Sequence, residues 1–312
     1  MKKLIHRIFF NFDDTVDPFL PYLDTWRREL PDFEIKLWDK SNLPLDLNAY
    51  TKYMTATKNH AFLSDYFRCW LLVNEGGAYL DADIEVLDGG IFRKIYEETQ
   101  LAQDFTLFIG IESARNGELT PHSMGVKCGE THDMLHYLMN LYETVFTTSM
   151  RYVIQHFTMP DLIVLYFMEH EENKQYSLSR KGHFYGYSAP LVTKNMKIYP
   201  QDYFSPVTTY NNEMMISAFS NNTCLCHHFA ATWKKEKKMP GALFATLLKE
   251  NGYVIAPELV SAVKDRYELP VVPRKPAWAL NSSEIAALER VLNRCIPYGG
   301  KLYSMLRKLR KG

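Results

Sequence analysis

Apolar residues alternate with polar ones at two different spacings along the first part of the chain. Residues 4–10 and 33–38 are short, apolar and β-prone, and each is followed by turn-forming residues, which predicts two strands. Between them, residues 19–30 carry apolar side chains at helical spacing. This alternation of strand and helix favours an α/β fold with a parallel sheet.

The next segment has the same order of a helix followed by a strand. Residues 58–74 have the spacing of a helix, and Gly76-Gly77 ends it. A strand is then predicted to begin at Ala78 and to lead into an acidic stretch. Residues 181–210 are loop-rich with short strands, and weaker patterns elsewhere predict strands at 105–111 and 223–229 and helices at 132–145, 162–169 and 241–249.

Composition narrows the class of protein. A hydrophobic share of 46% is sufficient for a substantial core, and 36 basic residues balance 36 acidic ones, so no global positive field indicates nucleic-acid binding. Five scattered cysteines favour a reducing cytosol over a secreted disulfide framework. His6 and Arg7 interrupt the first apolar run, unlike a signal peptide, and no stretch reaches transmembrane length. We therefore expect a cytoplasmic protein.

Two carboxylates, Asp81 and Asp83, stand at the end of the strand that begins at Ala78. Residues two apart on a strand share one face, and at a strand end both carboxylates can reach one divalent cation. Such an ion can bridge two phosphates and, as a Lewis acid, makes a nucleoside diphosphate a better leaving group. A bare pair is a weak signal, because solvated loops are rich in Asp.

The surrounding residues extend this pair into a longer pattern. SDYFR at residues 64–68 is followed by GGAYLDAD at residues 76–83. The pattern resembles glycosyltransferase family 32, whose members have Ser-Asp, an Arg three residues after the Asp, and Gly-Gly-x-Tyr-x-Asp-x-Asp. It also resembles the catalytic core of clostridial glucosylating toxins. The resemblance implies a GT-A type α/β fold: a Rossmann-like mixed sheet flanked by helices, with a helical C-terminal extension.

Asp65 and Arg68 are three residues apart on the predicted helix, so they share a face and can line one pocket with Asp81. An ion pair within the helix is the alternative. The resemblance implies that Asp65 and Arg68 hold donor hydroxyls and that they are catalytic together with Asp81 and Asp83. The full set that it assigns to the nucleotide-sugar comprises Ile8, Phe9, Phe10, Asp65, Arg68, Gly77, Tyr79, Asp81, Ala82, Asp83, His228, Thr232 and Trp233.

A second motif, HHFAATW at residues 227–233, resembles the family's closing His-His-x-x-x-Ser-Trp, with Thr232 in place of Ser. The resemblance implies that His228 completes a metal shell with the two aspartates and that Trp233 contacts the diphosphate or caps the sugar. The sequence leaves open which of His227 and His228 meets the metal.

A zinc site is a different interpretation of this segment. Cys224, Cys226 and His228 alternate onto one face of the predicted strand. A fourth ligand is missing from the pattern, and paired cysteines in a strand usually pack as small apolar side chains. We therefore prefer the glycosyltransferase interpretation.

The resemblance implies a retaining glycosyltransferase that depends on Mn²⁺ or Mg²⁺. It would transfer a hexose or N-acetylhexosamine from a nucleotide-sugar, a UDP-sugar rather than a GDP-sugar, to a saccharide or lipid-linked saccharide acceptor in bacterial surface polysaccharide synthesis (capsule, O-antigen or lipooligosaccharide). Glu112, Asp104 and Asp133 are candidate nucleophiles by residue type only, and front-face attack is preferred. The alternatives are a non-catalytic carbohydrate-binding scaffold and a metal-dependent nucleotidyltransferase, which should have a Gly-rich phosphate loop after its first strand.

We expect a catalytic domain over residues 1–260, with a donor-binding core at 1–110 and acceptor-side and closing segments at 111–260. Residues 261–312 form the predicted helical extension. Its end, residues 301–312, has five basic side chains, no acidic one, and leucines on one helical face. Either this tail docks on the domain as a solvated helix, or it contacts the anionic inner face of the plasma membrane.

Overall fold

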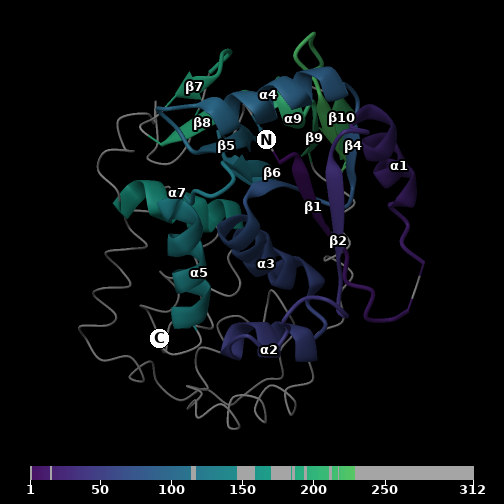
Figure 1. Cartoon of the computed structure of the whole chain (residues 1–312), viewed down its shortest axis with the longest axis vertical. Helices are drawn as coiled ribbons and strands as arrows, with labels where there is room; N and C mark the ends of the chain where they lie inside the picture. Colours follow the sequence, from purple (N-terminus) through teal and green to yellow (C-terminus); the bar gives the residue numbers. More distant parts are fainter. Residues whose placement is uncertain are drawn as a thin grey trace.

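The chain folds around one mixed β-sheet with helices on both faces (Figure 1). The strands are β1 (Leu4–Ile8), β2 (Glu34–Trp38), β3 (Gly77–Leu80), β4 (Ile84–Val86), β5 (Leu107–Ile111), β6 (Leu119–Val126), β7 (Leu191–Val192), β8 (Met196–Tyr199), β9 (Val207–Tyr210), β10 (Glu213–Ile216) and β11 (Leu225–His227). The helices are α1 (Leu20–Glu29), α2 (Ala49–Ala56), α3 (His60–Glu75), α4 (Gly89–Leu101), α5 (Asp133–Val145), α7 (Met159–Glu169) and α9 (Gln201–Phe204). The computed structural model describes residues 2–14, 16–113, 117–145, 159–169, 184, 187–192, 195–210, 213–216 and 218–228.

The main sheet has seven strands in the order β2-β1-β3-β6-β5-β8-β7. β1 pairs in parallel with both β2 and β3, whereas β6 is antiparallel to both β3 and β5. This confirms the expected α/β class, with a mixed sheet flanked by helices. Because β1, β2 and β3 run in parallel, their carboxyl ends meet at one edge of the sheet, where ligands of α/β proteins usually bind.

Each face of the sheet has its own hydrophobic core. Ile8 and Tyr79 pack on the face covered by α3, α5 and α7, while Ile5 and Ala78 pack on the face covered by α1 and α4. Figure 1 shows α4 and α3 on opposite sides of the strands. Burial of apolar surface on both faces of β1 and β3 therefore fixes the strands that lead into the acidic turn.

Two glycines make the sharp connection from α3 to β3. Gly76 and Gly77 have φ angles of 68° and 90°, a region that favours glycine. A Cβ atom on Gly77 would lie 2.8 Å from the carbonyl oxygen of Leu4 on β1. The pair thus sets the distance between the helix that carries Asp65 and Arg68 and the strand that leads to Asp81.

A small second sheet lies beside the carboxyl end of β3. It consists of β4 and β11, which pair antiparallel with His227 opposite Ile84. Helix α1 anchors it, because Trp26 Nε1 donates to the Ile84 carbonyl at 2.7 Å and Val86 N donates to Thr25 Oγ1 at 2.9 Å, both in buried positions. This sheet brings residues that are about 140 positions apart in sequence together at one end of the main sheet.

Most of the predicted elements that fall on described residues are present, with ends shifted by a few residues. The helices α2, α4 and α9, the strand β10 and the central antiparallel strand β6 were not predicted. The helix predicted at 241–249 and the extension at 261–312 lie outside the described residues. No described helix is long and apolar enough to cross a membrane.

Candidate active site

The two aspartates project from a tight turn between β3 and β4. Ile84 N donates to the Asp81 carbonyl at 3.1 Å, which closes the turn, and Asp81 N donates to the His122 carbonyl of β6 at 2.9 Å. Both aspartates follow the end of β3, as expected, but they lie in a turn and not on the strand itself. A turn, not strand alternation, brings the two carboxylates to one side.

His227 joins the two aspartates. Its Nε2 lies 3.3 Å from Asp83 Oδ1, and one ligand atom from each of Asp81, Asp83 and His227 lies within 4.8 Å of the others. Two carboxylates and one imidazole are a suitable donor set for a divalent transition ion such as Mn²⁺. Among the described residues this is the only such group, so the zinc interpretation built on Cys224 and Cys226 finds no ligand cluster there.

His228, which was expected in the metal shell, lies elsewhere. Its Nε2 is 2.9 Å from Glu85 Oε2, and its ring stacks on Tyr22 of α1 with centroids 4.4 Å apart. Adjacent residues of an extended segment point to opposite sides, so the two histidines cannot both face the aspartates. The structure thus places His227 at the aspartate pair, and His228 contributes its backbone N, which donates to the Asp83 carbonyl at 3.2 Å.

Arg68 connects the helix to the acidic turn. Its guanidinium lies 3.0 Å from Asp65 Oδ1 and 3.2 Å from Asp81 Oδ1, and it stacks over the Tyr79 ring. The Tyr79 hydroxyl donates to the same Asp81 oxygen at 2.6 Å. The two residues therefore form the ion pair along the helix and also lie beside Asp81, while their contact with donor hydroxyls stays a prediction.

Burial dominates the electrostatics of this group. It raises the pKa of Asp65 to about 6 and also raises that of Asp81, although Arg68 opposes both shifts. Burial lowers the pKa of His227, but Asp83, Asp81 and Glu112 outweigh it and raise the pKa above its usual value. The excess of carboxylates over cations makes this a site that attracts positive charge.

Of the three carboxylates proposed as nucleophiles by residue type, one lies near this site. Glu112 follows β5 directly and interacts electrostatically with His227 and Asp81. Burial raises its pKa, while His227 and a hydrogen bond from Thr120 act in the opposite direction. Asp104 is exposed at the other end of β5, and the exposed Asp133 accepts from the hydroxyl of Tyr166 at 2.8 Å.

The remaining predicted positions fall into two groups. Ile8, Phe9 and Phe10 are at the carboxyl end of β1, where Phe9 is half-buried and contacts Phe19 edge to face. Ala82 lies within the acidic turn. Thr232 and Trp233 lie outside the described residues, so only the first half of the second motif is placed.

Residues that the sequence did not single out complete the surroundings. Tyr22 stacks on His228, and buried His122 packs against His227 with ring centroids 4.3 Å apart. Ser205, in the segment after α9, is hydrogen-bonded to the His122 ring through its hydroxyl. No local pattern marks these residues, because they reach the site through α1, the unpredicted strand β6 and a loop-rich region.

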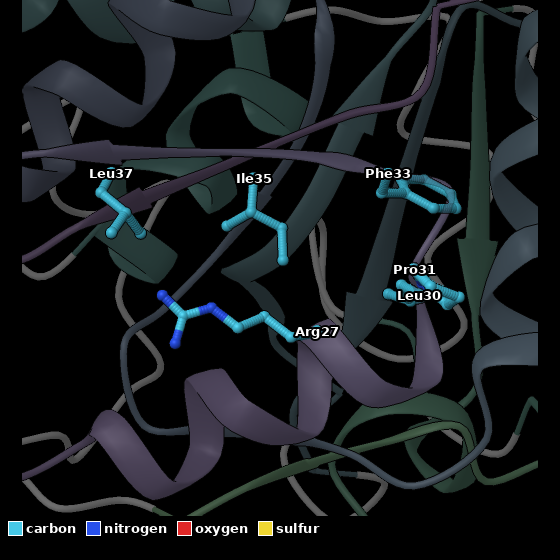
Figure 2. Close-up of a pocket in the computed structure, with 6 residues that line it drawn as sticks. All are labelled: Arg27, Leu30, Pro31, Phe33, Ile35 and Leu37. Atoms are coloured by element: carbon cyan, nitrogen blue, oxygen red, sulfur yellow. The ribbon is translucent and has the colours of Figure 1, made fainter.

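A hollow of about 320 Å³ lies between α1 and the edge strand β2, apart from these residues (Figure 2). Figure 2 shows Arg27 of α1 extending beneath strand β2. The lining residues are Arg27, Leu30, Pro31, Phe33, Ile35 and Leu37. None of them belongs to the acidic site, so the hollow and the site are separate features.

Comparison with known proteins identifies the region around the acidic turn. Residues 18–101 match the family model described as "Glycosyltransferase sugar-binding region containing DXD motif". No curated protein matches the chain.

Several solved structures are similar at low identity. "PaToxG Glycosyltransferase" has 15% identity and a TM-score of 0.37, over 47% of this chain and 62% of that one. A "glycosyltransferase involved in the glycosylation of the major capsid of PBCV-1" has 9% identity and a TM-score of 0.29, over 46% and 66%. The ligand-free glycosyltransferase domain of the YGT toxin has 10% identity and a TM-score of 0.33, over 99% and 93%.

The chain thus spans less than two thirds of the length of the first solved structure, and these scores carry no information about its substrate. The family match covers α1 to α4, which includes Asp65, Arg68, Asp81 and Asp83. Residues 18–101 are therefore similar to the sugar-binding region of DXD glycosyltransferases.

Proposed function

We propose that the chain is a divalent-metal-dependent glycosyltransferase that transfers a sugar from a nucleotide-sugar to a saccharide acceptor. The observation that carries the proposal is the convergence of Asp81, Asp83 and His227, with ligand atoms within 4.8 Å of one another, inside the matched sugar-binding region or beside it. An imidazole nitrogen in this set favours Mn²⁺ over Mg²⁺, which prefers oxygen ligands.

Different residues around the turn would bind different parts of the donor. Asp81, Asp83 and His227 would hold the metal, which when bound offsets the charge that develops on the leaving diphosphate. Arg68 sits beside Asp81 and can offset phosphate charge, and Asp65 is placed next to it as an acceptor for donor hydroxyls. Their buried, fixed geometry would supply positioning and electrostatic stabilisation.

We further propose that the donor is a UDP-linked hexose or N-acetylhexosamine and that the reaction retains the anomeric configuration. Front-face attack, in which the leaving phosphate takes the acceptor proton, needs no protein nucleophile. If a protein carboxylate does take part, Glu112 is the candidate, because it faces His227 and Asp81 whereas Asp104 and Asp133 do not.

The proposed acceptor is a saccharide or lipid-linked saccharide of a bacterial surface polysaccharide, made on the cytoplasmic side of the membrane. The basic composition of residues 301–312, with five Lys or Arg side chains and no acidic one, supports contact with an anionic membrane surface. Deletion of residues 301–312 should weaken binding to phosphatidylserine-containing vesicles, and unchanged binding would remove this part of the proposal.

Linked metal and nucleotide binding tests the core of the proposal. Mn²⁺ together with UDP should raise the melting temperature more than either alone, because a ligand that binds the folded state stabilises it by mass action. Asp83→Asn should remove the joint shift, whereas Asp104→Asn, an exposed carboxylate away from the site, should retain it. A joint shift that survives in Asp83→Asn would contradict the assignment of the metal to the acidic turn.

A further inference from the structure

His122 lies behind the proposed metal group and contacts two parts of it. Its carbonyl oxygen accepts the Asp81 N–H at 2.9 Å, which fixes the start of the acidic turn. Its ring packs against the ring of His227, with centroids 4.3 Å apart and a tilt of 38°. His122 of β6 thus contacts Asp81 through its backbone carbonyl and His227 through its side chain.

The orientation of the His122 ring is itself fixed. Nδ1 is hydrogen-bonded to Ser123 Oγ at 2.8 Å, and Nε2 to Ser205 Oγ at 2.7 Å. The side chain is 2% exposed, and Ser205 is fully buried. Ser205 is in turn held after α9, where its backbone N donates to the Gln201 carbonyl at 2.9 Å. Both ring nitrogens are therefore engaged, and the ring cannot turn without breaking two buried hydrogen bonds.

We infer that His122, locked by Ser205 and Ser123, is a positioning residue that holds His227 and Asp81 in the geometry that binds the metal. This inference rests on the proposed metal site and adds the residues that keep it in shape. Partners behind the ligands of a metal commonly set ligand orientation, and their loss typically lowers metal affinity about 10- to 100-fold. The alternative is a core histidine that serves stability alone.

The hydrogen bonds of the His122 ring are compatible with this role. A neutral imidazole has one donor and one acceptor nitrogen, and the two serine hydroxyls can match either tautomer.

Ser205→Ala is the mildest test, because it removes one hydroxyl and leaves the fold's apolar contacts intact. Thr99→Val is the matched control: it also removes one buried hydroxyl, which donates to the Ile95 carbonyl within α4, away from the site. Titration calorimetry with Mn²⁺ alone should show an affinity lowered about tenfold in Ser205→Ala and unchanged in Thr99→Val, even when both lower the melting temperature equally.

Two further measurements keep the outcomes distinct. His122→Leu should weaken Mn²⁺ binding more than His122→Gln, whose amide can still bond the Ser205 hydroxyl. In metal-free protein, the ¹⁵N resonances of the His227 ring should shift in Ser205→Ala and stay in place in Thr99→Val. Wild-type Mn²⁺ affinity in Ser205→Ala and His122→Leu, or unmoved His227 resonances, would overturn the inference. Failure of the wild type to bind Mn²⁺ would instead count against the proposed function, and the resonances would still test His122.

Discussion

His227 Nε2 lies 3.3 Å from Asp83 Oδ1, although 143 residues of chain separate the two positions. The contact depends on the pairing of β11 with β4, which places His227 opposite Ile84. His228, the next residue, is instead turned to Glu85 and Tyr22. Adjacent histidines of one motif therefore have separate environments, and substitution can distinguish them.

Metal binding should depend on His227 and not on the side chain of His228. His227→Ala removes one of three ligands and should lower Mn²⁺ affinity by at least tenfold in titration calorimetry. His228→Ala is the matched control and should change the affinity less than threefold, because its backbone contact to Asp83 persists. The reverse ranking would show that the metal is bound by the other histidine.

Arg68 should matter strongly for stability because it is buried between two carboxylates. Arg68→Met leaves Asp65 and Asp81 without their cation and should lower the free energy of unfolding by about 3–5 kcal/mol in urea denaturation. Arg27→Met removes an exposed ion pair with Asp24 and should cost less than about 1 kcal/mol. Equal losses in the two variants would contradict the bridging role of Arg68.

Asp65 should make stability depend on pH between about 4 and 6. Burial raises its pKa to about 6 in the folded protein from the ordinary value of 3.8, so the folded state binds this proton more tightly than the unfolded state. The free energy of unfolding should therefore fall as pH rises through this window, by about 3 kcal/mol for this group. Denaturation curves from pH 4 to 7 should show a shallower fall in Asp65→Asn, and an identical slope would refute the assignment.

Gly77 should tolerate substitution much less well than another glycine with positive φ. Gly77→Ala combines an unfavourable φ of 90° with a Cβ atom 2.8 Å from the Leu4 carbonyl oxygen. Gly129 has a similar φ of 82°, but a Cβ atom added there would have no atom within 4 Å. Gly129→Ala should therefore lower the free energy of unfolding by only about 1–2 kcal/mol, the cost of a left-handed backbone conformation for alanine. Thermal unfolding should show the larger loss for Gly77→Ala; equal losses would mean that strand β1 moves to accommodate the methyl group.

The sequence predicted the donor side of the site better than its surroundings. Asp65, Arg68, Asp81 and Asp83 stand within one short stretch, so helix periodicity and strand order were sufficient to bring them together. The contribution of His227, by contrast, depends on the register of β11 against β4. No local pattern specifies that register, and alternation alone could not decide between adjacent histidines.

The same limit explains the residues that were missed. β6 is buried along its whole length, so its sequence, LTPHSMGV, lacks the alternation of a half-exposed strand, and it contains a proline and a glycine. His122 could not be recognised without that strand. Ser205 follows a four-residue helix in a region where periodicity gives little.

Release of nucleoside diphosphate tests the central claim most directly. A panel of UDP- and GDP-sugars would be incubated with the wild type and with Asp83→Asn, in Mn²⁺ and in EDTA. We predict slow hydrolysis of one UDP-sugar by the wild type, abolished by EDTA and by the substitution. Absence of release and of donor binding across the panel would contradict the account and would indicate a carbohydrate-binding scaffold that has lost the chemistry.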